Sequence, residues 1–157
     1  MQQQRGFTLI EMMVTLTLLG TLAAAAMPLV QHYHQQRQEE MLRDSLRQIR
    51  EAIDRYYQAS KEGRIEKKTD ASGYPPTLRS LVEGVVDKKS PNGGKLYFLR
   101  RIPRDPMCNC DARPDEETWR LRASNAPPGD FTGGKDVYDV RSTSTASGLN
   151  GVSYATW

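Results

Sequence analysis

The chain has 157 residues, of which 38% are hydrophobic and 26% are charged, and its formal net charge at pH 7 is +3. This length leaves room for one small soluble domain beside an apolar N-terminal segment, and the mean hydropathy of −0.66 limits that domain to a modest core. The mild net charge, without aromatic residues interleaved among the basic ones, excludes a typical nucleic-acid-binding surface.

An apolar run extends from Phe7 to Val30 and is long enough for a helix that crosses a membrane, which needs about 20 residues. One carboxylate, Glu11, lies inside this run, where a charge costs roughly 2.5–3.5 kcal/mol on insertion scales. No Lys, Arg or His lies between Phe7 and Val30. We therefore predict a transmembrane helix over residues 7–30, in which Glu11 is paired by another molecule or by a free amine at the start of the segment.

The residues that lead to this carboxylate read Gly6-Phe7-Thr8-Leu9-Ile10-Glu11, and they resemble the processing site of type IV pilins and type II secretion pseudopilins. The resemblance implies that residues 1–6 are a leader, removed after Gly6 by a membrane prepilin peptidase that also methylates the new N-terminal Phe7. It implies further that Glu11 meets the amine of a neighbouring subunit during assembly. Only cleavage after Gly6 puts a cation close enough to compensate this carboxylate in lipid.

A secretory signal peptide is the alternative for this end of the chain, because an apolar stretch after a basic residue, here Arg5, is typical of one. Residues 23–26 are all alanine and could form a small-residue cleavage site. The apolar run is, however, longer than the about 7–15 residues of a signal h-region, which has no use for Glu11. Under this alternative the chain is a signal-anchored periplasmic binding protein that never polymerises.

Residues 31–62 have the pattern of an amphipathic helix that continues the apolar segment and stops at Gly63. Apolar residues at spacings of four, three, four and three form one stripe along it: Leu42, Leu46, Ile49, Ile53 and Tyr56. We predict that the rest of the soluble domain packs on this stripe. Opposite charges four residues apart, such as Arg50 and Asp54, are expected to pair on the solvated face of the helix.

Gly20 and Pro28 weaken the apolar half of the predicted helix, because glycine is flexible and proline removes a backbone hydrogen bond. In the pilin family, a glycine and a proline at these places bracket a stretch that melts when subunits enter the filament. The resemblance therefore implies that residues 20–28 are the extensible part of the chain.

Residues 63–157 are predicted to form a small globular head made of short elements. A short helix is expected over residues 77–82 with Thr77 as its cap, and Pro91-Asn92-Gly93-Gly94 signals a turn. Strands are expected at residues 96–99, 119–123 and 137–142. The sequence thus predicts an α+β fold, in which one long N-terminal helix packs against a small antiparallel β-sheet.

The order of several head motifs resembles the major, G-type pseudopilin of type II secretion systems. The matching residues are Tyr74, Pro75, Leu78, Leu81, Pro103, Asp105, Pro106, Trp119, Tyr138, Asp139, Ser142 and Trp157. The resemblance implies a pilin-like fold and a structural subunit of a periplasmic pseudopilus, anchored by a single pass through the inner membrane. It implies as partners the prepilin peptidase, copies of the chain itself, other pseudopilins and the inner-membrane assembly platform. A minor type IV pilin of a surface pilus is the alternative within this class.

The last loop departs from the G-type family, which binds calcium there through backbone carbonyls and two or three aspartates. Calcium takes about six to eight oxygen ligands, with carboxylates among them, but residues 143–154 contain neither Asp nor Glu. We expect Asn150-Gly151 to form a tight turn in place of the site, and Asp130, Asp136 and Asp139, which lie upstream, to be solvated strand ends. The expectation is that the chain has no calcium site and no other cofactor.

The two cysteines, Cys108 and Cys110, are separated only by Asn109. In an oxidising compartment they could form a local disulfide, and free thiols, a metal site or an intermolecular bond are the alternatives. A lone Cys-x-Cys is weak evidence for zinc, which takes four ligands. Because type IVa pilins usually close a large C-terminal loop with two widely spaced cysteines, the close pair favours a pseudopilin over an adhesive pilin.

An enzymatic function is not expected. The only histidines, His32 and His34, flank Tyr33 at the predicted boundary between membrane and water, and they are interpreted as interfacial residues rather than as a catalytic or metal-binding pair. The sequence contains no nucleophile motif, phosphate-binding loop or metal-spaced cluster. The only chemistry assigned is the chemistry done to the chain between Gly6 and Phe7.

Overall fold

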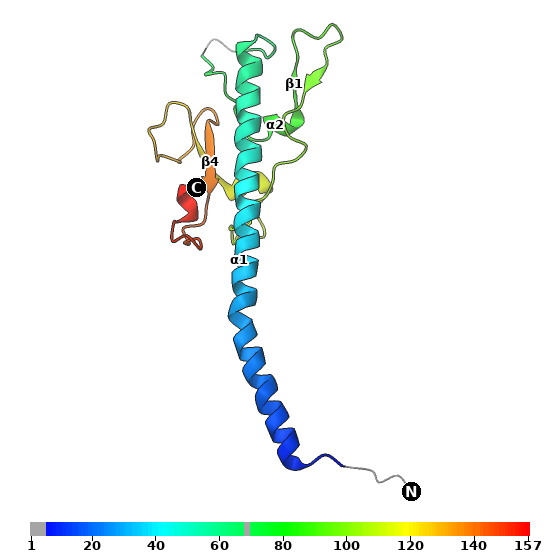
Figure 1. The fold of residues 1–157 in the computed structure, drawn as a ribbon. Coiled ribbons are helices and arrows are strands. Elements are labelled where there is room, and N and C mark those ends of the chain that lie inside the picture. Colours follow the sequence, from blue (N-terminus) through cyan, green and yellow to red (C-terminus); the bar gives the residue numbers. More distant parts are fainter. Residues whose placement is uncertain (1–5, 68–69) are drawn as a thin grey trace. The chain divides into compact units, whose positions relative to one another are not determined.

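The structure, a computed structural model, describes residues 6–67 and 70–157, except for the side chains of residues 25, 26, 28 and 29. The chain forms two compact units, Met1–Arg37 and Gln38–Trp157, and helix α1 (Leu9–Lys61) contributes to both. Figure 1 shows α1 and the short elements of the second unit along the chain.

In the first unit, α1 exposes its apolar side chains on all sides. Its threonine hydroxyls are satisfied by the helix itself, since Thr15, Thr17 and Thr21 each donate to a carbonyl three or four residues earlier, at 2.7–3.0 Å. Within the described residues, no helical stretch has both the length and the apolarity that crossing a membrane requires. The transmembrane segment of residues 7–30 stays a prediction.

In the second unit, the apolar stripe of α1 forms the centre of the core, which confirms its predicted role. All five residues of the stripe are at most 7% exposed, and Ala52 and Ala59 extend the buried surface. The head covers the stripe with side chains from its short elements and loops: Ile65, Leu78, Leu81, Trp119, Val137, Val140 and Tyr154. Each large apolar side chain buried in this way stabilises the head by roughly 1.5–3 kcal/mol.

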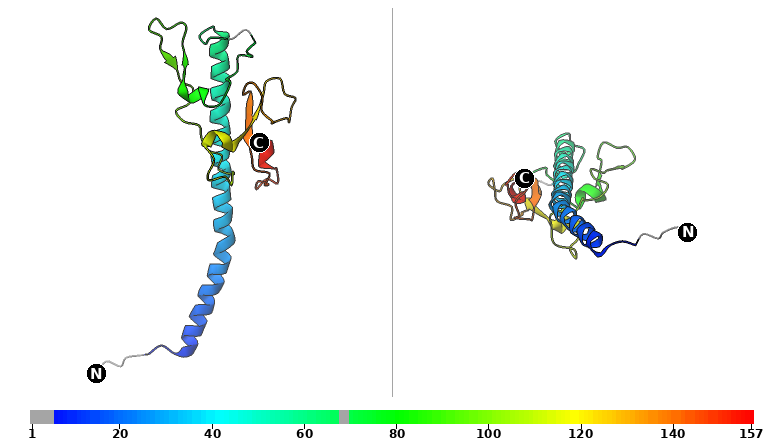
Figure 2. Two further views of the ribbon diagram at one scale, coloured as in Figure 1. Left: turned by 180° about the vertical axis from the view of Figure 1, so that it is seen from behind. Right: turned by 60° about the horizontal axis from the view of Figure 1, so that its bottom comes forward.

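The head contains two separate antiparallel strand pairs. Strand β1 (Val85–Val86) pairs with β2 (Lys95–Leu96), and β3 (Trp119–Arg122) pairs with β4 (Asp139–Ser142). The views in Figures 1 and 2 show the two pairs on opposite sides of the second half of α1. The predicted α+β, pilin-like fold is confirmed, and the small antiparallel sheet takes the form of these two pairs.

The register of the second pair explains which of its side chains reach the core. Trp119 lies opposite Ser142, and Leu121 lies opposite Val140. Because side chains alternate between the two faces of a strand, these four residues share one face, on which Trp119, Val140 and Ser142 are buried. Strand β3 is thereby fixed against α1 through its tryptophan.

The strand predicted at residues 96–99 is shorter in the structure, where β2 covers only Lys95–Leu96. Strand β2 stops after Leu96, because the backbone N–H groups of Phe98 and Leu99 both donate to the Leu81 carbonyl at 3.0 Å instead of to a partner strand. Leu81 belongs to helix α2 (Ser80–Glu83), which is likewise shorter than the predicted 77–82 helix. Thr77 still accepts a hydrogen bond from the Ser80 N–H, at 3.3 Å, in the turn that precedes α2.

Three further short elements complete the chain. The 3-10 helix η1 (Asp115–Thr118) leads directly into β3, and the 3-10 helix η2 (Tyr154–Thr156) lies next to the C-terminal Trp157. Between β4 and η2 runs the last loop, where Ser147 and Ser153 form an isolated antiparallel bridge.

Gly84 ends helix α2 with a φ of 76°. A side chain would not fit there, because a Cβ on Gly84 would lie 2.7 Å from the ring of Tyr97.

Arg50 joins α1 to the end of the chain. Its Nε donates to Asp139 Oδ1 at 2.8 Å, and its Nη2 donates to the carbonyls of Val140 and Trp157 at 3.0 and 2.9 Å. The predicted pairing of Arg50 with Asp54 is therefore wrong. A bond to an exposed neighbour on the helix is replaced by three bonds that fix strand β4 and the C-terminus against the helix.

The ion pair between Arg64 and Asp87 predicts a pH-dependent stability. Arg64 donates to Asp87 Oδ2 at 2.6 and 3.2 Å, and this guanidinium holds the pKa of the Asp87 carboxyl below its ordinary value. A carboxylate whose pKa is lowered in the folded state stabilises that state above its unfolded pKa of about 3.9, and this contribution is lost as the pH falls through the folded value. Asp87→Asn should therefore lower the free energy of unfolding at neutral pH, with a difference from wild type that shrinks toward zero below about pH 4.

Urea unfolding of the full chain in detergent at a series of pH values measures this difference, with the exposed carboxylate in Asp111→Asn as the matched control. A difference for Asp87→Asn that is constant down to the most acidic pH would contradict the assignment.

Candidate assembly and processing site

The site lies at the start of α1, where Thr8 precedes the first helical residue, Leu9. The Glu11 carboxylate accepts two hydrogen bonds at Oε2, from the Thr8 N–H at 2.8 Å and from the Thr8 hydroxyl at 2.9 Å. In return, the Glu11 N–H donates to Thr8 Oγ1 at 3.3 Å. This reciprocal pattern is a capping box, which satisfies backbone donors that the first turn of a helix leaves without a partner.

The capping box gives Glu11 a partner within its own segment. The absence of Lys, Arg and His from the segment does not reveal this partner, because Thr8 donates through a neutral N–H and a neutral hydroxyl. These bonds supply no positive charge, so the pairing of Glu11 with the amine of another molecule stays a prediction. The Thr-x-x-Glu spacing of residues 8–11 is the signal in the sequence that identifies the cap. A negative charge at this end of a helix is also favoured by the helix dipole.

The side chains around the carboxylate are exposed and mostly apolar. Phe7 is 82% exposed, and Leu9 and Ile10 are 79% and 70% exposed. A helix that is apolar on all sides is stable only when other apolar groups cover it, either lipid or the same segments of other subunits. The capped Glu11 carboxylate thus lies within an exposed apolar surface, which lipid or other apolar helices must cover.

The predicted cleavage point is open. Gly6 and Phe7 precede α1 in an irregular segment, both are exposed, and nothing lies within 4 Å of a Cβ placed on Gly6. An exposed peptide bond outside a helix or strand is accessible to a peptidase. The remainder of the predicted leader, residues 1–5, lies outside the described residues.

The two positions predicted to allow melting lie within continuous helix. The backbone of α1 passes through Gly20 and Pro28 without a break, and a Cβ placed on Gly20 would meet no atom within 4 Å. The side chain of Pro28 lies outside the described residues. The melting of residues 20–28 stays a prediction.

Cys108 and Cys110 form a disulfide in the structure. Of the states that the sequence leaves open for these cysteines, the local disulfide is the one observed. The disulfide lies in a loop that backbone hydrogen bonds close on both sides, from Cys108 N–H to Asp105 O at 3.2 Å and from Arg113 N–H to Cys110 O at 3.0 Å. Within residues 6–67 and 70–157, no group of three or more His, Cys, Asp and Glu side chains is arranged to hold a metal ion.

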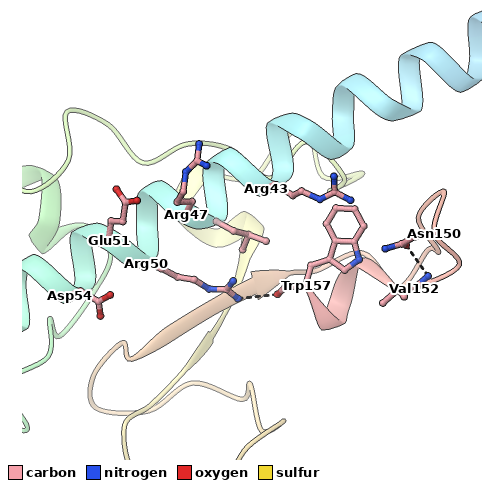
Figure 3. A pocket seen from close by; sticks show the side chains of 9 residues that line it. Arg43, Arg47, Arg50, Glu51, Asp54, Asn150, Val152 and Trp157 are labelled. Carbon is pink, nitrogen blue, oxygen red and sulfur yellow. Dashed lines mark hydrogen bonds between the residues drawn. The ribbon is translucent and has the colours of Figure 1, made fainter.

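His34 contacts an aromatic neighbour, and a pocket of the head is lined mainly by charged residues of α1. His34 contacts Tyr33 edge to face, and Tyr33 in turn accepts a hydrogen bond from Arg37 at 2.7 Å. A pocket of about 520 Å³ lies between α1 and the last loop (Figure 3), and neither a histidine nor a cysteine lines it. Its lining residues are Arg43, Leu46, Arg47, Arg50, Glu51, Asp54, Asn150, Val152 and Trp157.

Comparisons with known proteins define the class. Residues 1–27 match the family model of the prokaryotic N-terminal methylation motif, which covers Gly6, Phe7 and Glu11. This match, the long capped helix and the small α+β head are together those of a pilin-like subunit with an N-terminal methylation motif. No solved structure matches the chain.

Curated relatives define the family. The chain is 34% identical over 112 residues to the type II secretion system core protein G of Pseudomonas aeruginosa, an alignment that spans 69% of this chain and 71% of that protein. The core protein G of Klebsiella pneumoniae is 32% identical over 114 residues, 68% of this chain and 71% of that protein. The protein of the same name from Escherichia coli is 30% identical over 111 residues, 68% of this chain and 69% of that protein.

The chain belongs to the family of the type II secretion system core protein G. Members of this family are pseudopilins, the structural subunits of a membrane-anchored periplasmic pseudopilus. The resemblance to the G-type pseudopilin of type II secretion systems is thereby confirmed.

Proposed function

We propose that the chain is cleaved after Gly6 and methylated at Phe7 by the prepilin peptidase, and that it then assembles into the periplasmic pseudopilus that drives type II secretion. The observation that carries this proposal is the Glu11 carboxylate, capped at the start of α1, where the described apolar side chains of the first unit are exposed. Copies of the chain, other pseudopilins and the inner-membrane assembly platform are its partners. The chain itself catalyses no reaction.

Cleavage after Gly6 creates the cation that the segment lacks. The new amine of Phe7 lies close to the Glu11 carboxylate of an adjacent subunit, and the two charges compensate each other as the apolar helices pack together. Burying a charge without a partner is very costly, so a subunit in the wrong register is rejected. The capping hydrogen bonds from Thr8 hold the carboxylate in place until the amine arrives.

Before assembly, residues 7–30 hold the subunit in the inner membrane as a single pass, with the head in the periplasm. Support for this step comes from the apolar composition of the segment and from its hydroxyls, which bond to the helix carbonyls and so need no water. On entry into the filament, residues 20–28 extend, because Gly20 and Pro28 weaken the helix there.

Mass spectrometry of the chain purified from its native membrane tests the processing step. The expected N-terminal peptide begins at Phe7, carries one methyl group on its amine, and becomes an unprocessed peptide in a strain without prepilin peptidase. A peptide that begins after the alanines of residues 23–26 would overturn the proposal in favour of a signal peptide. An intact N-terminus in the wild-type strain would also overturn it.

A further inference from the structure

The last loop, residues 143–153, is a closed hairpin rather than an open ligand-binding loop. The Gly148 N–H donates to the Val152 carbonyl at 2.9 Å, and the Gly151 N–H donates to the Gly148 carbonyl at 2.9 Å. The turn runs from Gly148 to Gly151, where Gly151 has a φ of 76°. The tight turn expected at Asn150 and Gly151 is present.

Four backbone oxygen atoms of this loop already accept hydrogen bonds within the head. The carbonyls of Gly148 and Val152 accept the bonds just described, the Ala146 carbonyl accepts from the Tyr154 N–H at 3.0 Å, and the Thr145 carbonyl accepts from the Ser153 hydroxyl at 3.1 Å. The loop contains no carboxylate. Calcium requires about six to eight oxygen ligands with negative charge among them, so the residues present do not fit it.

The aspartates upstream of the loop are hydrogen-bonded elsewhere, and the expectation that Asp136 and Asp139 are solvated strand ends is wrong, because both accept bonds from protein groups. Asp139 accepts from Arg50 at 2.8 Å, and Asp130 accepts from the N–H and hydroxyl of Thr132 at 3.1 and 2.8 Å. Asp136 accepts from the Ser124 N–H at 2.8 Å and from the hydroxyls of Ser124 and Ser72. None of these contacts brings the three carboxylates to the loop.

The negative charge at the loop comes instead from α1. Glu39 is 4% exposed, and its Oε1 accepts from the Leu149 N–H at 2.7 Å and from the Tyr154 hydroxyl at 3.0 Å. Gly148 allows this approach, because a Cβ there would lie 3.1 Å from Glu39 Oε1 and 2.9 Å from the Trp157 ring. The loop therefore directs an N–H donor, that of Leu149, toward the Glu39 carboxylate. A cation site would require oxygen atoms at this position instead.

Trp157, the last residue of the sequence, packs beside the loop and contacts both Arg43 and Tyr154. The guanidinium of Arg43 lies over the ring of Trp157, 4.4 Å from its centroid, and the Trp157 ring meets that of Tyr154 edge to face at 5.1 Å. Figure 3 shows Trp157 between Arg43 on the helix and the loop that carries Asn150 and Val152. The loop is thus held between a buried carboxylate and an aromatic side chain at the end of the chain.

We propose that the Glu39 carboxylate does in this chain what a metal ion would do in the last loop: it fixes residues 146–154 from inside, so that the head folds independently of calcium. The proposal rests on residues of the head and goes beyond the assembly role of Glu11. Glu39 is a positioning residue, since it holds the loop and the C-terminal tryptophan in place.

Thermal unfolding of the full chain in detergent tests this proposal, with either excess calcium or EGTA present. Wild type should unfold at the same temperature in both conditions. Glu39→Gln should unfold roughly 5–10 °C lower in both, because the amide still accepts from Leu149 and Tyr154 but lacks the negative charge that strengthens these bonds. The exposed neighbour in Glu40→Gln is the matched control and should unfold as wild type does.

Two further measurements separate a local effect from general unfolding. Amide hydrogen exchange in Glu39→Gln should rise at residues 147–154 and stay unchanged in β3 and β4. Terbium added to wild type should give no saturable emission sensitised by Trp157 and Tyr154, which lie beside the loop, and this measurement needs no variant. A higher unfolding temperature with calcium, saturable terbium emission that calcium displaces, or unchanged exchange in Glu39→Gln would each overturn the proposal.

Discussion

Glu11→Ala should abolish filament assembly and leave cleavage after Gly6 intact. In the proposed filament, the variant leaves the amine of each Phe7 without its carboxylate among packed apolar helices, and an uncompensated buried charge costs about 3–5 kcal/mol. Such a cost corresponds to a loss of assembled filament of roughly 100-fold or more. Shearing of overproduced filaments, followed by immunoblotting of the sheared and membrane fractions, measures both assembly and processing.

Glu11→Gln separates the charge of this residue from its role as a helix cap. The amide retains an oxygen that can accept from the Thr8 N–H, so the first turn of α1 stays capped while the negative charge is gone. We expect the glutamine variant to fail in assembly almost as completely as the alanine variant. Filaments of wild-type abundance in Glu11→Gln would contradict the carboxylate–amine pair and reduce Glu11 to a capping residue.

The second large effect is expected for Asp105→Ala, which should remove roughly 3–5 kcal/mol from the free energy of unfolding of the head. Asp105 is 1% exposed. One carboxylate oxygen accepts from the Ser142 hydroxyl at 2.7 Å and the Thr143 N–H at 3.1 Å, and the other accepts from the Met107 N–H at 2.9 Å. Its removal leaves these donors unpaired at the point where the Cys108–Cys110 loop meets the end of β4.

Urea unfolding of the full chain in detergent measures this loss, and Asp115→Ala provides the control. Asp115 forms an exposed pair with Arg104 at 3.2 Å, which should contribute less than about 1 kcal/mol. Losses of the same size in the two variants would show that Asp105 does not organise the head.

The sequence predicts the central part of the fold well, because the relevant signals are local. The spacing of Leu42, Leu46, Ile49, Ile53 and Tyr56 alone identifies the buried stripe of α1. Gly63 marks the end of the helix to within two residues, since α1 ends at Lys61. Strands β3 and β4 lie inside the ranges predicted from alternation.

Contacts between distant residues account for what the sequence does not predict. Arg50 pairs with Asp139 rather than with Asp54, because a partly buried site with three acceptors outcompetes an exposed neighbour. Strand β2 is short because the Leu81 carbonyl takes the hydrogen bonds of Phe98 and Leu99. Local spacing contains no information about either partner.

The candidate site likewise has parts that local sequence signals predict and parts that depend on contacts between distant residues. The processing motif and Glu11 are evident in the sequence, and the capping role of Thr8 follows from a four-residue pattern that a search for charges passes over. Glu39 is different, since it is separated from Leu149 by 110 residues and from Tyr154 by 115. On the helix it is one more glutamate in a charged stretch, and only the folded head shows that it is buried.

Deletion of the gene in the native host, with secreted proteins and sheared surface filaments compared side by side, is the most direct test of the central claim. Exoproteins should accumulate in the periplasm of the deletion strain while surface pili and twitching persist, and wild type but not Glu11→Ala should restore secretion. Loss of pili or twitching with normal secretion would contradict it and assign the chain to a type IV pilus.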